Sequence, residues 1–252
     1  GGKMSKFISK QSVAIWYALT ALLATFLVGQ VILWFFPDGS SMGASLLFIL
    51  MNLIPLITAA VFSLVVREVN SLGEFFKKVF LQKESPLSWI LAFFIPVIYY
   101  GISILLMNVR FTGNSLLAFF LYFPWTLLYG GLEEVGWRWF LQDHLSFSKH
   151  FIPKMMLLSL VWFLWHIPIY QLPWITAGSS NYLIFYLMIL GNTFLFGALK
   201  EYSKGAVPCI LAHMLIDSLA VLMLVQSSLS QIILLVIFEI LLASWLVAIR
   251  KS

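Results

Sequence analysis

The sequence predicts an all-α, polytopic membrane protein with about eight transmembrane helices. Of the 252 residues, 62% are hydrophobic and only 10% are charged, whereas soluble domains carry about 25% charged residues. Apolar runs of about 20 residues, the length that crosses a bilayer, recur along the chain. Basic residues are concentrated in alternate loops. This composition excludes a disordered chain, a coiled coil and a nucleic-acid-binding protein, and the single cysteine excludes an intrachain disulfide.

The predicted elements begin with a short tail, residues 1–11, in which Gly1-Gly2-Lys3 look like the remnant of an expression tag and Met4 like the natural start. The first apolar run is too long for a cleavable signal peptide. The predicted spans are Ser12–Phe36, Gly43–Val66, Leu87–Met107, Ser115–Trp139, Phe151–Pro173, Asn181–Leu199, Ala206–Val225 and Ser230–Ile249. We therefore expect three spans within residues 12–110, a functional core over 115–222 and a C-terminal span within 230–252.

The connector 67–85, between the second and third spans, combines apolar and basic residues at helical spacing. Phe75, Phe76 and Val79 alternate there with Lys77 and Lys78. This pattern predicts an amphipathic helix on the membrane surface.

The basic residues predict the orientation. Thirteen of them fall on one side of the predicted topology, and one falls on the other. The thirteen are Lys3, Lys6, Lys10, Arg67, Lys77, Lys78, Lys83, Lys149, Lys154, Lys200, Lys204, Arg250 and Lys251, against Arg110 alone. The positive-inside rule then places both termini in the cytoplasm of an integral, multi-pass protein of the cell membrane.

Three predicted spans carry ionisable residues at bilayer depth, where such residues are expensive and usually line a shared cavity. They are Glu133, Glu134 and Arg138 in the fourth span, His166 in the fifth, and His213 and Asp217 in the seventh. Glu134 and Arg138 are four residues apart, as are His213 and Asp217, so each pair shares a helix face. Glu133, rotated by about 100° from Glu134, is expected to point elsewhere. Gly130 and Gly131 would let another helix approach closely.

This set of residues predicts a peptide hydrolase without a covalent nucleophile. Glu133 would deprotonate a water that His166 helps to hold, and His213 with Asp217 would stabilise the oxyanion. Glu134 and Arg138 would support them. A zinc ion held by Glu133, His166 and His213 is the alternative, although no H-E-x-x-H motif occurs. The residues themselves leave both mechanisms open.

For the other polar residues and the cysteine, the sequence predicts only the environment of the side chain. His144 and Asp143 are expected on the solvated surface, and Asn192 is expected to face the cavity. Glu239 is an isolated acid at depth to which no role is assigned. Cys209, on the face of His213, is expected to be a buried apolar residue.

The motifs Glu133-Glu134-x-x-x-Arg138, Trp162-x-x-x-His166 and His213-x-x-x-Asp217 resemble those of the CPBP family. This family, also called Abi, contains the CAAX proteases and the membrane proteins that process bacteriocins or confer immunity to them. The resemblance covers about residues 115–220. Trp162 replaces the family's usual Phe and is expected to pack equivalently. Asp217 replaces the common Asn and, because a carboxylate cannot donate a hydrogen bond, is expected to orient His213.

The resemblance implies an eight-helix intramembrane endopeptidase whose site opens toward the cytoplasm, with a peptide or protein substrate at the membrane. The family has been described both as metal-dependent and as metal-independent proteases, and we favour the mechanism without a metal or other cofactor. A non-proteolytic immunity or scaffold protein that binds a peptide remains an alternative, as does a proton-coupled transporter. The sequence predicts neither the substrate nor the oligomeric state.

Overall fold

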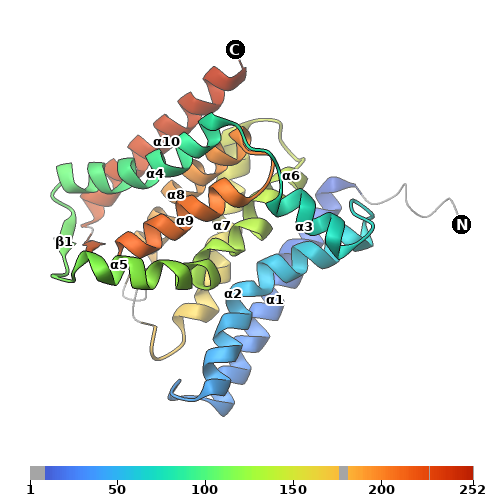
Figure 1. The fold of residues 1–252 in the computed structure, drawn as a ribbon, viewed down its shortest axis with the longest axis horizontal. Helices are drawn as coiled ribbons and strands as arrows, with labels where there is room; N and C mark the ends of the chain where they lie inside the picture. Colours follow the sequence, from blue (N-terminus) through green and yellow to red (C-terminus); the bar gives the residue numbers. More distant parts are fainter. Residues whose placement is uncertain (1–8, 176–180, 227, 252) are drawn as a thin grey trace, which may run out of the picture.

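The computed structural model describes residues 9–175, 181–226 and 228–251, so residues 1–8 of the predicted tail lie outside the described part. The chain folds into packed helices and one short β-ladder (Figure 1). The long elements are α1 Lys10–Phe35, α2 Met42–Val65, α4 Pro86–Leu105, α7 Phe151–Tyr170, α8 Tyr182–Tyr202 and α10 Leu229–Lys251. The short ones are α3 Leu72–Phe80, α5 Leu116–Tyr122, α6 Gln142–His144, α9 Val207–Leu219, β1 Val109–Phe111 and β2 Met223–Val225.

Serine residues begin the first four helices. The hydroxyls of Ser9, Ser41, Ser71 and Ser85 each accept a hydrogen bond from a backbone N–H in the first turn of α1, α2, α3 and α4. Such caps satisfy donors that the helix itself leaves unpaired. The helix starts are therefore encoded locally.

In the described part of the chain, six helices are long and apolar enough to cross a membrane: α1, α2, α4, α7, α8 and α10. Many of their large apolar side chains are exposed, as is typical of residues that face lipid. The prediction of a helical, polytopic membrane protein is confirmed at this level, although the two strands of the β-ladder were not anticipated.

Two predicted spans differ from simple crossings. The fourth is a pair of helical segments bent by 55° near Trp125. The seventh corresponds to α9, whose 13 residues extend about 20 Å, less than the hydrocarbon core of about 30 Å. The number of crossings therefore stays a prediction.

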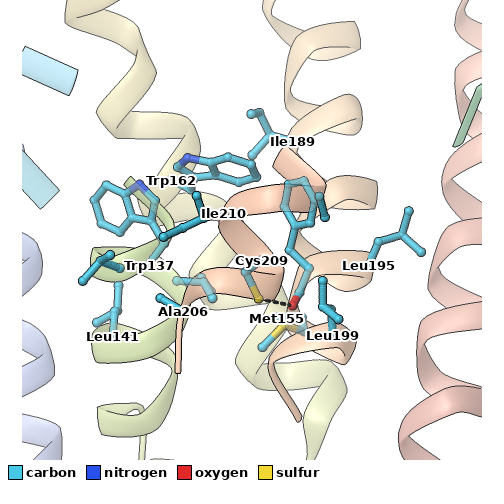
Figure 2. Close-up of a cluster of buried hydrophobic side chains, with 14 of the residues drawn as sticks. Trp137, Leu141, Met155, Trp162, Ile189, Leu195, Leu199, Ala206, Cys209 and Ile210 are labelled. Atoms are coloured by element: carbon cyan, nitrogen blue, oxygen red, sulfur yellow. Dashed lines mark hydrogen bonds between the residues drawn. The ribbon is translucent and has the colours of Figure 1, made fainter. Parts of the chain in front are cut away.

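The helices pack around a buried apolar cluster. Trp137, Met155 and Trp162 are among its members, as Figure 2 shows. Cys209 belongs to this cluster, and its thiol lies 3.7 Å from the Phe196 carbonyl. It thus behaves as the small buried residue that the sequence predicts.

The molecule has two distinct ends. At the basic end, α3 packs against the start of α9, where Ala206 N donates to the Val79 carbonyl at 2.9 Å. At the opposite end, β1 pairs antiparallel with β2, with Arg110 opposite Leu224. These two features lie on opposite sides of the molecule in Figure 1.

Candidate active site

Glu133, Glu134 and Arg138 lie on the second half of the bent fourth segment. This half contains two π-helical stretches, Leu127–Gly131 and Val135–Leu141, which flank the two glutamates. π-Helical turns are rare and are found frequently at functional sites. Here they flank two consecutive glutamates that both contact His213.

Two glycines allow α9 to pack directly against this segment, as the sequence predicted. A Cβ atom on Gly130 would collide with Asp217 Oδ2 and would lie 3.0 Å from His213 Nε2. A Cβ atom on Gly131 would lie 2.8 Å from Met214 Cγ. The close approach therefore requires glycine at both positions.

The imidazole of His213 is surrounded by three carboxylates. His213 Nδ1 donates to Glu134 Oε1 at 2.7 Å. On the other edge of the ring, Nε2 lies 3.5 Å from Glu133 Oε1 and 3.4 Å from Asp217 Oδ2. Glu133, Glu134 and His213 are all buried.

Glu133 and Glu134 point in different directions, as expected, and reach opposite edges of one ring. One other expectation is corrected. Glu134, rather than Asp217, makes the short hydrogen bond that orients His213. The i,i+4 spacing of His213 and Asp217 indicated proximity, but it could not reveal a shorter contact from another helix.

Arg138 completes the buried network. Its Nε donates to Glu134 Oε2 at 2.8 Å, and both side chains are fully buried. The guanidinium lies 4.7 Å from the centroid of the Trp162 ring and 5.7 Å from that of Phe196. The Phe196 ring also stacks on His213, at 5.4 Å between centroids. Aromatic faces attract a cation, so these rings favour the charged guanidinium away from water.

Phe196, on α8, is a neighbour of His213 and Arg138 that no sequence motif indicates. The chain contains 23 phenylalanines, and nothing in the local sequence distinguishes this one. Trp162 was expected to replace a phenylalanine by packing alone, and the structure adds its contact with Arg138.

His166 lies on the other side of the site, near the end of α7. Its Nδ1 donates to the Trp162 carbonyl at 2.7 Å. In the neutral ring, this bond leaves Nε2 as an acceptor. A neutral His166 can therefore accept a hydrogen bond from a bound water.

Two cavities reach these residues. A larger one, of about 880 Å³, is lined by His166, His213 and Asp217 but not by Glu133. A smaller one, of about 410 Å³, is lined by all four. The four predicted catalytic residues are therefore brought together around the smaller cavity, and three of them also face the larger one. Asn192 lines the larger cavity, as expected.

Both cavities approach the end of the molecule opposite the basic end. The larger one is lined by Asn181, Gln226 and Ser228, and the smaller one by Ile175. No residue of the connector 67–85 lines either cavity. If the basic end lies in the cytoplasm, the cavities approach the other side of the membrane. The two predictions, cytoplasmic termini and a site that opens toward the cytoplasm, therefore exclude each other.

The metal alternative involves different ligands from those predicted. In the described part of the chain, one group of His, Cys, Asp and Glu side chains has donor atoms close enough for a metal ion: Glu133, Glu134 and His213, all within 4.8 Å of one another. His166 is not part of this group. Arg138 already pairs with Glu134, and its positive charge opposes a cation at the same carboxylate.

Two further expectations have different outcomes. His144 is buried rather than solvated, and its Nε2 donates to Glu68 Oε1 at 2.8 Å, which ties the connector to the bent segment. Asp143 is half-exposed, as expected, and pairs with Lys200 at 3.1 Å. Glu239 is buried against Gly191.

The helical bundle and the buried carboxylate–histidine cluster define a polytopic membrane protein with a polar site inside its apolar core. Residues 114–219 match the family model described as "Type II CAAX prenyl endopeptidase Rce1-like". The predicted resemblance to the CAAX protease family is therefore confirmed over this segment, which contains all three motifs. At the level of the family, this supports an intramembrane endopeptidase, a hydrolase. A search of curated proteins found no match to the chain.

Proposed function

We propose that this protein is an intramembrane endopeptidase that cleaves a peptide bond of a membrane-associated peptide by activating a water molecule with Glu133. The main support is the position of Glu133 beside His213, on a cavity that His166 and Asp217 also line. No nucleophilic serine or cysteine is needed, and Cys209 is directed into the apolar cluster.

The proposed reaction begins with a water between Glu133 and His166. Glu133 takes one proton, His166 Nε2 accepts a hydrogen bond from the other, and the oxygen attacks the carbonyl carbon. His213, protonated at Nε2, donates to the resulting oxyanion. The carbon–nitrogen bond then breaks as Glu133 returns its proton to the leaving amine.

Glu134, Arg138 and Asp217 support this reaction in the proposal. Glu134 holds Nδ1 of His213 and so fixes the orientation of the ring. Asp217, near Nε2, favours the protonated ring. Arg138 balances the charge of Glu134.

We further propose that the reaction is independent of metal, because the carboxylate that completes the possible ligand group is paired with Arg138. Cleavage should persist after treatment with a strong chelator. Loss of cleavage that added zinc restores would contradict this part of the proposal.

We also propose that both termini are cytoplasmic and that the substrate reaches the site from the opposite membrane surface. The distribution of basic residues supports the first statement, and the residues that line both cavities support the second.

The test uses purified protein in nanodiscs and a quenched-fluorescent decapeptide with a farnesylated C-terminal CAAX sequence, beside its unprenylated form. Glu133→Gln should abolish cleavage of any peptide that the wild-type protein cleaves, because the amide cannot accept the proton of the water. Glu74→Gln, at a partly exposed glutamate of α3 at the basic end, is the matched control and should retain activity. Cleavage by Glu133→Gln at the wild-type rate would refute the mechanism, and no cleavage of either peptide by the wild type would count against the function.

A further inference from the structure

Among the residues that the structure describes, the short β-ladder has a free edge. Within it, Thr112 N donates to the Leu222 carbonyl at 3.0 Å, and Gln226 N donates to the Asn108 carbonyl at 2.8 Å. Leu224 lies between these two positions and pairs with Arg110. The backbone groups of residues 222, 224 and 226 are therefore directed at β1.

Successive residues of an antiparallel strand direct their backbone groups to opposite sides. The N–H and C=O groups of Met223 and Val225 consequently point away from β1. In the described part of the chain, the sheet has two strands, so no third strand covers this edge. Unpaired backbone groups are unfavourable next to lipid and are a ready template for another extended chain.

This edge adjoins the larger cavity. Leu224, Val225 and Gln226 line the cavity, whereas no residue of β1 does. The same cavity is lined by His166 and His213. A peptide paired with the edge of β2 would therefore lie beside a cavity that reaches His166, His213 and Asp217, three of the four proposed catalytic residues.

We propose that Met223–Val225 is a docking strand, to which an extended segment of the peptide substrate adds as a third β-strand. The proposal rests on the endopeptidase function given above. An extended peptide backbone is the occupant because it supplies donors and acceptors at the two-residue repeat of the edge. Lipid chains supply neither.

The cavity also offers sites for the side chains of such a peptide. Tyr99, Tyr100, Tyr170 and Phe185 are aromatic residues that line it. Side chains of a bound strand alternate between two faces. Side chains on the face of the peptide that enters the cavity would then contact aromatic rings, which favours apolar or aromatic residues at alternate substrate positions.

The test measures binding to the full-length Glu133→Gln protein in nanodiscs, so that it does not depend on cleavage. The probe is the farnesylated decapeptide with a fluorescent label, N-methylated at one residue at a time. N-methylation removes one backbone donor, and loss of one hydrogen bond should weaken binding by about three- to tenfold. We expect this loss at alternate residues and little change at the residues between them.

Equal losses at every position, no loss at any position, or no binding of the parent peptide would each overturn the docking strand. Wild-type cleavage of the same peptides separates the two proposals. Absent cleavage with alternating binding counts against the endopeptidase alone, and cleavage without alternation counts against the docking strand alone.

A variant of the protein provides a second test. Val225→Pro deletes an N–H group on the free edge and leaves the bonds to β1 in place. It should weaken binding of the parent peptide by about three- to tenfold. The control Phe111→Pro deletes an N–H group on the outer edge of β1, away from β2, and should bind as Glu133→Gln does alone. Unchanged affinity in a folded Val225→Pro protein overturns the proposal. So does a dimer, measured by light scattering, that Val225→Pro dissociates, because the edge would then pair with a second copy of the chain.

Discussion

At the scale of single residues, the geometry of the site depends on Glu134. Its two oxygens accept hydrogen bonds from Arg138 Nε and His213 Nδ1, and so it links the bent fourth segment to α9. Both bonds involve charged groups and are buried, which makes them strong and makes the loss of one partner costly. Glu134 is therefore a structural link between the two helices, and the proposed reaction also relies on it to orient His213.

Arg138→Ala should destabilise the protein by about 3–5 kcal/mol, because it leaves the Glu134 carboxylate buried without its counter-ion. The free energy of unfolding in mixed micelles measures this effect. Arg250→Ala removes a partly exposed pair with Glu201 and should cost at most about 1 kcal/mol. An equal decrease in the free energy of unfolding in the two variants would contradict the prediction that the buried pair contributes more than the exposed one.

Gly130→Ala should lower the cleavage rate at least tenfold, because the added methyl group displaces Asp217 and crowds His213. This corresponds to an increase of about 1.4 kcal/mol or more in the activation free energy. Gly101→Ala is the matched control, since a Cβ atom there meets nothing within 4 Å. It should retain the wild-type rate. A fully active Gly130→Ala protein would show that the close approach of α9 is not needed for catalysis.

At the scale of elements, the connector is fixed to the helical core at several points. Phe75 of α3 packs edge-on against Trp139, with 5.4 Å between ring centroids. Glu68 accepts a hydrogen bond from His144. Glu84 accepts hydrogen bonds from the backbone N–H groups of Lys204 and Gly205. The amphipathic helix is therefore part of the folded core rather than a loose connector.

Glu68→Gln should reduce the loss of stability in acid. The hydrogen bond from His144 holds the pKa of Glu68 below its ordinary value of 4.5. The folded state therefore binds this proton less readily than the unfolded state, so the contribution is complete above the ordinary pKa and is lost as the pH falls through the lowered value. Unfolding temperatures from about pH 7 to about pH 3 should converge for the wild type and the variant. Curves that stay parallel would contradict this.

At the scale of the whole molecule, the two ends have different chemistry. The basic end gathers the connector, the loop after the bent segment and the start of α9, and Lys200 and Arg250 form ion pairs there. The opposite end holds the β-ladder, and the cavities approach it. The orientation of the protein in the membrane therefore determines from which membrane surface the substrate reaches the cavities.

Cysteine labelling in intact cells tests this polarity. Ser228→Cys, at the opposite end, should react with a membrane-impermeant maleimide added outside. Lys204→Cys, at the basic end, should react only after permeabilisation. The buried Cys209 should give little background. The reverse pattern would place the termini outside the cytoplasm and the cavities on the cytoplasmic side.

The amino-acid sequence alone determined the helical membrane class, the positions of the six long helices and the six polar residues of the site. These features can be predicted because hydropathy, helix caps and short motifs are local properties of the chain. The same logic failed at His144, which is buried because its partner Glu68 lies far from it in the sequence.

Only the tertiary structure decided that Glu134 orients His213, that Phe196 stacks on it and that the fourth segment is bent. It also decided that the cavities approach the end opposite the basic residues. The physical reason is that each of these features depends on atoms far apart in the sequence: Glu134 and His213, 79 residues apart, meet at 2.7 Å. Hydropathy indicates that a polar residue inside a membrane needs a partner, but the packing of the helices determines which residue that partner is.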